Sequence, residues 1–130
     1  MALAAAPAAA QAGGPIYSGS PAEEYARARA VVYATVLAYR DSVLVVDGIQ
    51  VPSGVLTYKV TKTWKGCTAD TIQVLSPGGG HRYYRLASTP GSQDMLYLFP
   101  LSSNLYRAGD RSGSIERTAK DRAELQLEAP

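Results

Sequence analysis

The chain has 130 residues and a formal net charge of +2, with 46% apolar and 18% charged residues. This length and composition fit one globular domain with an ordinary core, and they argue against intrinsic disorder. The net charge is too small to indicate nucleic acid or an anionic membrane as the partner. Cys67 is the only cysteine and His81 the only histidine, which excludes an intrachain disulfide and both multi-cysteine and two-histidine metal sites. No apolar run reaches the roughly 18 residues of a membrane span.

Residues 1–19 are expected to be a leader that precedes the folded domain. Eight of the first twelve residues are alanine. The segment Ala10-Gln11-Ala12 has the small-x-small form of a signal-peptidase site, and a glycine-rich start follows it. The leader therefore predicts export of a bacterial protein to the periplasm or the medium. An Ala/Pro tail without targeting meaning is the alternative.

The folded domain is assigned to residues 20–130, and it is predicted to begin with a short helix. Ser20 can cap the helix, Pro21 suits its first position, and Glu23 completes a capping box. The helix is expected to end near Ala30.

Two long β patterns follow. Side chains alternate from Ala30 to Tyr39, and the face that carries Val32, Ala34 and Val36 is small enough for the interior of a tight barrel. Residues 40–54 contain two turn-forming segments, Asp-Gly and Pro-Ser-Gly, which predict a loop with a short strand at 43–46. A second strand is predicted from Val55 to Trp64, with Lys65-Gly66 closing it.

The second half of the chain predicts shorter elements. Strands are expected at 71–76 and 95–99, and 105–108 pairs with 114–116 in a hairpin around Gly109-Asp110. Residues 118–128 predict a helix, because Ile115, Ala119, Ala123 and Leu127 repeat at a spacing of four. About five strands with a helix at each end predict an all-β fold, an OB-like five-stranded Greek-key barrel.

Four segments resemble the netrin-like OB-fold family, in particular bacterial members similar to the N-terminal domain of tissue inhibitors of metalloproteinases. They are 28–37, similar to the family's first strand; 56–66, which ends in Trp-Lys-Gly; 96–99, Leu-Tyr-Leu-Phe; and 116–118, Glu-Arg-Thr before the last helix. The resemblance implies the OB barrel and a role in binding proteins.

The cysteines of that family are missing from this chain. His81 or Arg82 stands where the central cysteine would fall, and Ile115 stands at the closing one. The eukaryotic inhibitors place an N-terminal cysteine amine and carbonyl on the protease zinc. No cysteine is available here for that role, so the family's inhibitory residues do not carry over.

The most unusual local cluster follows the glycines at 78–80. It combines basic and aromatic residues, the types that are enriched at binding hot spots, and its members are His81, Arg82, Tyr83, Tyr84 and Arg85. We predict that this cluster carries the main partner contact. The loop at 41–54 or the freed N-terminus would be the binding surface if it does not.

Other chemistry-bearing residues favour structural roles. Cys67 and His81 lack a specified orienting acid, Tyr58 and Trp64 share a strand face and suit the core, and the charges at 107–117 suit a solvated surface. Asp94, Asp110 and Asp121 lie in separate segments, so no catalytic carboxylate pair is predicted.

The sequence thus predicts a binding domain that is not an enzyme and needs no cofactor or metal, with a protein as partner. Divergent protease inhibition, and OB-type binding of nucleic acid or oligosaccharide, are the alternatives, and a small hydrolase comes last.

Overall fold

The computed structural model describes residues 19–77 and 89–130. The elements, in chain order, are α2 (Pro21–Arg27), β1 (Ala30–Val46), β2 (Ile49–Lys65), β3 (Thr71–Pro77), β4 (Gln93–Ser102), β5 (Leu105–Ala108), β6 (Gly113–Ser114) and α3 (Ala119–Glu124). The predicted all-β class is confirmed, since strands make up most of the fold and the two helices are short.

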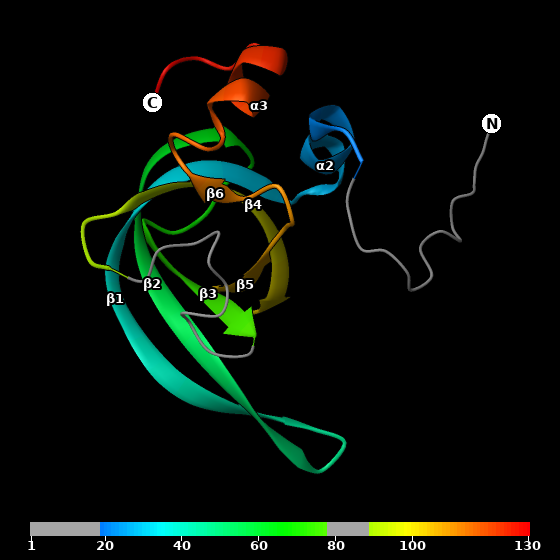
Figure 1. Cartoon of the computed structure of the whole chain (residues 1–130), viewed down its shortest axis with the longest axis vertical. Coiled ribbons are helices and arrows are strands. Elements are labelled where there is room, and N and C mark those ends of the chain that lie inside the picture. The colour runs from blue at the N-terminus through cyan, green and yellow to red at the C-terminus, as the bar shows by residue number, and fades with distance from the viewer. Residues whose placement is uncertain (1–18, 78–88) are drawn as a thin grey trace, which may run out of the picture.

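Five of the six described strands close into a ring (Figure 1). The order around the ring is β1-β2-β3-β5-β4, and β4 returns to β1 through a ladder that pairs Ala30 with Leu98 and Thr35 with Gln93. The β3–β5 pairing is parallel, and the other pairings are antiparallel. The short β6 adds to β4 at Asp94 and Met95.

The ring is filled from alternate positions of its strands. The inward residues of β1 are small, as the sequence pattern predicted, and they meet larger side chains from the facing strands. The buried members of this core are Ala30, Val32, Ala34, Val36, Leu56, Tyr58, Ile72, Val74, Leu96, Leu98 and Ala108.

A second cluster lies under the helices, on the other face of β1 and β4. Val31, Met95 and Tyr97 are its buried centre, and Trp64 and Leu125 pack against it. The prediction that Trp64 is buried in line with Tyr58 is wrong. The β1–β2 ladder shifts register at Tyr33/Ala34 and again at Val31/Val32.

The first shift makes Thr61 an extra residue of β2 and turns the side chains that follow it to the other face, and the second shift makes Trp64 itself the extra residue. Trp64 is consequently half-buried in the second cluster, where its indole Nε1 donates a hydrogen bond to Glu128 O at 3.0 Å.

The first helix forms as its capping signal predicted. Ser20 Oγ accepts from the backbone N–H of Glu23, and Glu23 Oε1 accepts from the backbone N–H of Ser20. The helix ends at Arg27, a little before the predicted Ala30. The C-terminal helix is shorter than predicted and ends at Glu124, and Gln126 beyond it has a positive φ of 58° that no helix continues through.

Two loop predictions are wrong. The strand expected at 43–46 forms as the end of β1, but the rest of 40–54 is not a loop, because β1 and β2 run on as a two-stranded hairpin that turns only at Asp47-Gly48. We call its outer part, residues 37–54, the arm. It extends away from the ring on the side opposite α2 and α3 (Figure 1).

The predicted hairpin around Gly109-Asp110 does not form either. Leu105–Ala108 pairs with β3 and β4, and Gly113–Ser114 pairs with β4 further along. The two segments therefore lie one after the other along β4 and not side by side.

Candidate functional site

The predicted contact residues His81, Arg82, Tyr83, Tyr84 and Arg85 lie outside the described residues. Their assignment stays a prediction. In the described part of the chain, the arm and a charged hollow beneath the helices are further candidate surfaces.

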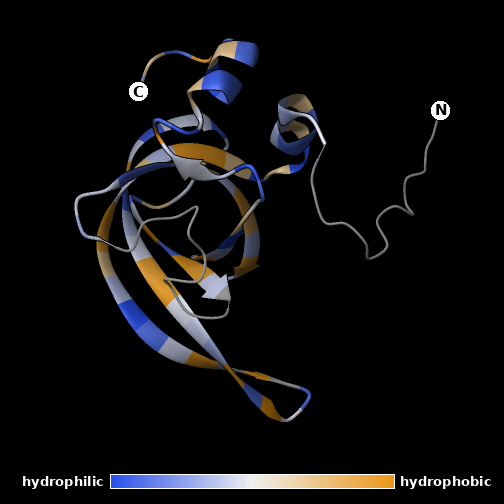
Figure 2. Ribbon diagram, viewed as in Figure 1, coloured by the Kyte–Doolittle hydropathy of each residue, from blue (hydrophilic) through white to orange (hydrophobic). Residues whose placement is uncertain are grey.

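The arm carries apolar side chains that water contacts. Val43 is 58% exposed, and Val45 and Ile49 are each 65% exposed. Val43 and Val45 lie opposite Pro52 and Gln50 on one face of the ribbon. Ile49 belongs to the neighbouring cross-strand pair and therefore lies on the other face. Figure 2 shows hydrophobic segments towards the tip of the arm, with hydrophilic segments nearer the ring and at the turn.

One edge of the arm has no strand partner among the described residues. β1 is hydrogen-bonded to β4 over Ala30–Thr35 only, and Val36 completes that contact with Gly91 and Ser92. Among the described strands, β2 alone pairs with β1 beyond that point. The β2 edge is better protected, because β3 covers it from Ser53 onward and Pro52 has no N–H to offer. Within 19–77 and 89–130, the arm thus presents a β1 edge without a strand partner and exposed apolar residues on both faces.

The turn at the tip of the arm follows from its sequence. Asp47 has a φ of 52° and Gly48 a φ of 79°. Positive φ at both central residues is the requirement of the tight hairpin turn for which Asp-Gly is a preferred pair. The same dipeptide that suggested a loop therefore specifies the end of a long hairpin.

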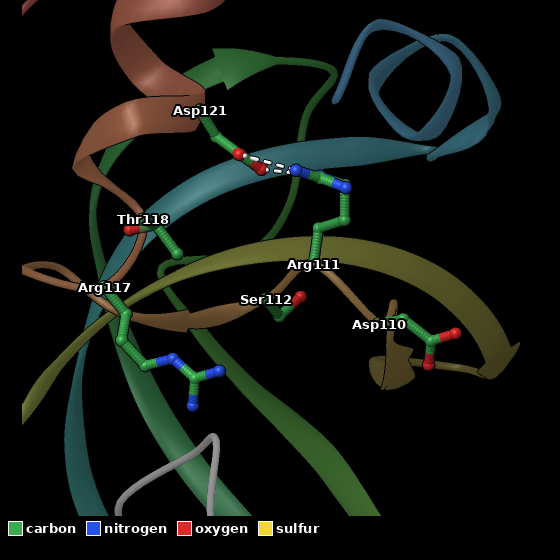
Figure 3. Close-up of a pocket in the computed structure, with 6 residues that line it drawn as sticks. All are labelled: Asp110, Arg111, Ser112, Arg117, Thr118 and Asp121. Carbon is green, nitrogen blue, oxygen red and sulfur yellow. Dashed lines mark hydrogen bonds and ion pairs between the residues drawn. The ribbon is translucent and has the colours of Figure 1, made fainter. Parts of the chain in front are cut away.

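The charged hollow lies between α3 and the turn after β5. It has a volume of about 210 Å³ and is lined by Asp110, Arg111, Ser112, Arg117, Thr118 and Asp121 (Figure 3). Arg111 and Asp121 form a two-pronged ion pair, in which Arg111 Nε donates to Asp121 Oδ2 at 2.8 Å and Nη2 donates to Oδ1 at 2.9 Å. Arg117 points away from this pair (Figure 3).

The ion pair is the centre of a larger network. Arg111 Nη1 donates to Gly19 O at 2.7 Å, and the Arg111 backbone N–H donates to Glu24 Oε2 at 2.9 Å. Tyr97 Oη donates to Asp121 Oδ2 at 2.8 Å. One arginine therefore joins both helices to the ring.

These hydrogen bonds shift the pKa values of Asp121, Arg111 and Tyr97. Burial disfavours the ionised form of Asp121, but hydrogen bonds from Arg111 and Tyr97 outweigh burial and lower its pKa below the usual aspartate value. The hydrogen bond to Asp121 raises the pKa of Arg111. Burial raises the pKa of Tyr97, and its bond to the carboxylate raises it further.

Arg111, Asp121, Tyr97 and Glu24 thus form a network in which the polar groups are hydrogen-bonded to one another and hold the two helices on the ring. The prediction that the charges at 107–117 are simply a solvated surface is wrong for Arg111, which is held by Asp121 and Glu24. Sequence reasoning missed both partners because they lie ten and 87 residues away from it. The arginine spacing alone carries no signal for such a contact.

The remaining sequence candidates take structural positions. Tyr58 is buried, as its assignment to the core predicted. Cys67 is exposed with a free thiol, and its suggested partner His81 lies outside the described residues. Within 19–77 and 89–130, no group of three or more His, Cys, Asp or Glu could hold a metal ion, and no helix is long and apolar enough to cross a membrane.

No protein-family model matches the chain, and no curated protein matches it either.

Proposed function

We propose that the chain is a non-catalytic binding domain that contacts another protein through the arm. The observation that carries this proposal is the exposure of Val43, Val45 and Ile49 on a ribbon that leaves the ring. Apolar side chains held in water by a projecting two-stranded element gain free energy when a partner covers them. An open strand edge adds main-chain hydrogen bonds to that gain.

The fold proposed for this function is the OB-type barrel. It is supported by the closed strand order β1-β2-β3-β5-β4 and by the parallel pairing of β3 with β5. We also keep the netrin-like relationship as a proposal. Three of its four similar segments fall largely in strands, namely 28–37 in β1, 56–66 in β2 and 96–99 in β4.

A protein suits the arm better than a nucleic acid does. An oligonucleotide site on an OB barrel needs free cations beside stacking aromatics. On β2, Lys62 pairs with Glu128 at 2.9 Å, and Lys65 donates to the carbonyls of Tyr25 and Ala26. Two of the lysines on this strand are thereby engaged within the molecule, whereas the outer part of the arm exposes the apolar side chains of Val43, Val45 and Ile49.

Protease inhibition remains the second candidate within protein binding. It is favoured by the arm itself, since a long projecting ribbon can reach into a cleft that the barrel cannot enter. An exported location is part of the proposal, because the alanine-rich leader with Ala10-Gln11-Ala12 motivates it.

The experiment compares variants in quantitative affinity capture from extracts of the source cells. The triple variant V43T/V45T/I49T keeps β-branched residues on the arm but removes much of its apolar surface. L101T is the matched control, because Leu101 is 49% exposed on β4 and outside the arm. We expect proteins captured by the natural chain to fall at least tenfold with the arm variant and to stay with L101T.

Equal capture by the natural chain and the arm variant would refute the assignment to the arm. The predicted contact at His81–Arg85 is tested in parallel by alanine at His81, Arg82 and Arg85, and by the separate variants Y83A and Y84A. Loss of the partner with these changes alone would place the contact on that segment.

A further inference from the structure

The segment that follows α3 folds back onto the outer face of the ring (red in Figure 1). A positive φ of 58° at Gln126 turns the chain, and the backbone N–H of Leu127 donates back to Arg122 O at 3.0 Å. Leu127 then packs against the second cluster. The next residue, Glu128, reaches β2. A four-residue segment, 125–128, therefore covers part of the face that β1 and β2 present to solvent.

Two side chains of β2 receive this segment, and both bind Glu128. The indole Nε1 of Trp64 donates to the backbone oxygen of Glu128 at 3.0 Å. The ammonium group of Lys62 donates to Glu128 Oε1 at 2.9 Å. Tyr33 of β1 lies opposite Lys62 in the ladder, and its ring centroid is 6.4 Å from that of Trp64. We call Tyr33, Lys62 and Trp64 the indole–lysine face.

The contacts on the indole–lysine face recognise a defined chemistry. The indole N–H reads a main-chain carbonyl, and the ammonium group reads the carboxylate of the same residue. The hydrogen bond and the charge of Lys62 lower the pKa of Glu128 below its ordinary value, so the carboxylate is ionised at neutral pH. The preceding residue, Leu127, supplies an aliphatic contact. An aliphatic residue followed by an acidic one is therefore the pattern that fits this face.

The hold on the segment is weak enough to be exchanged. The side chain of Glu128 is 84% exposed, and ion pairs in water contribute little to stability. Among the described residues, no hydrogen bond between main-chain groups ties residues 128–130 to the ring. Trp64 is only half-buried with the segment in place. Release of the segment therefore exposes a tryptophan with a free N–H, the residue type most enriched at binding hot spots.

We propose that the indole–lysine face binds a short acidic segment of a partner protein, in which an aliphatic residue precedes Glu or Asp, and that Leu127 and Glu128 occupy this site in the free chain. The partner and the chain's own segment then compete for one face. The apparent affinity for the partner is reduced by the fraction of molecules in which the segment is bound. The face shares no residue with the arm, so this inference stands independently of the proposed function.

The test uses the only tryptophan of the chain, whose indole N–H gives a single resonance in ¹⁵N-labelled full-length protein. The probe is the capped peptide Leu-Gln-Leu-Glu-Ala-Pro, and the control peptide has Gln in place of Glu. The variant L127S/E128Q weakens the chain's own segment. In this variant we expect a saturable shift with a dissociation constant on the order of 1 mM. The natural chain should bind the peptide at least fivefold more weakly, because its own segment competes.

Three further variants give the controls. E128Q changes an exposed residue outside the core, so it tests release without threatening the fold and should strengthen peptide binding at least twofold. K62Q, added to L127S/E128Q, should remove the preference for the glutamate peptide over the glutamine peptide. K59Q in the same background should retain that preference, because Lys59 is exposed on β2 and pairs with Thr35, outside the indole–lysine face. K59Q and K62Q change the net charge equally.

Four results would overturn the proposal. The first is the absence of a saturable indole shift in both E128Q and L127S/E128Q up to about 10 mM peptide. The second is equal affinity of the natural chain and L127S/E128Q, which would show that peptide and segment do not compete. The third is equal affinity for the two peptides. The fourth is a concentration-dependent dimer of the natural chain that L127S/E128Q abolishes, which would assign the face to a second copy's segment.

Discussion

Asp94 and Asp121 are two buried aspartates whose pKa values the fold shifts in opposite directions. Asp121 meets an arginine and a tyrosine that favour its charge, so its pKa falls. Asp94 meets a single tyrosine, Tyr58, and a nearby acid, Glu116, so burial dominates and its pKa rises to about 6. The partners that each residue meets, and not burial alone, decide which form is stable at neutral pH.

Asp94 should therefore make the protein less stable as the pH rises. A carboxyl whose pKa is 3.8 in the unfolded chain and about 6 in the fold binds a proton more readily when folded. Folding stability from this group is full below the unfolded value and is lost as the pH rises through the folded one.

The variant D94N removes this titration while keeping an acceptor for Tyr58. Relative to the natural chain, its free energy of unfolding should increase by up to about 3 kcal/mol between pH 4 and pH 8. Urea titrations of both proteins at a series of pH values measure the difference. A difference that stays constant with pH would contradict the assignment.

The variant R111A should destabilise the fold by about 2 kcal/mol at pH 7. It leaves the carboxylate of Asp121 in a site where its side chain is only 10% exposed, and a buried charge without its partner is costly. The partial exposure of Arg111 itself, at 30%, keeps the expected cost below that of a fully buried pair. R117A is the matched control, and thermal or urea unfolding should place it within about 0.5 kcal/mol of the natural chain.

At the scale of elements, signals between neighbouring residues predicted the structure correctly. The sequence did not predict which distant strands pair. Ser20, Pro21 and Glu23 specify the start of α2 because capping depends on neighbours within one turn. The arm was missed because Pro52 and Gly54 are turn residues in isolation, although at an edge strand a proline costs no ladder bond. Likewise the local turn at Gly109-Asp110 indicates a hairpin, but both flanking segments find a better partner in β4.

The cap of α2 gives a prediction at this scale. S20A removes the side-chain acceptor for the Glu23 N–H and one half of the capping box, which should cost about 1 kcal/mol of folding stability. S103A, at an exposed serine in the turn after β4, is the control and should cost much less. Urea midpoints at constant slope would report the difference, and equal midpoints would show that the cap contributes nothing.

At the scale of the molecule, we expect the ring to fold stably without a disulfide or a bound metal ion. The chain has one cysteine, and its core is continuous around five strands. Thermal melts with and without reductant, and with and without chelator, should superimpose. A large drop with chelator, or a drop with reductant that persists in C67S, would contradict this expectation.

The surroundings of Asp94 show what the sequence alone could not supply. Asp94 and Glu116 are 22 positions apart in the chain, and each is unremarkable in its own segment. Only the pairing of β6 with β4 places them beside one hollow. The contact between Arg111 and Glu24 has the same origin, since ring closure brings the two ends of the chain together.

Ring closure also sets an order of events in folding. β1 and β2 are joined by two turn residues, so their ladder can form within microseconds of collapse. By contrast, Ala30 pairs with Leu98, which lies 68 positions later in the chain, so β1 must wait for β4. The variant V55A, in the hairpin, should then mainly slow refolding, and M95A, at the seam, should mainly speed unfolding. Stopped-flow fluorescence of Trp64 separates the two rates.

Until β4 has been synthesised, one edge of β1 is unpaired along its whole length. Slow translation between residues 65 and 93 would therefore lengthen the interval in which nascent chains can pair with each other.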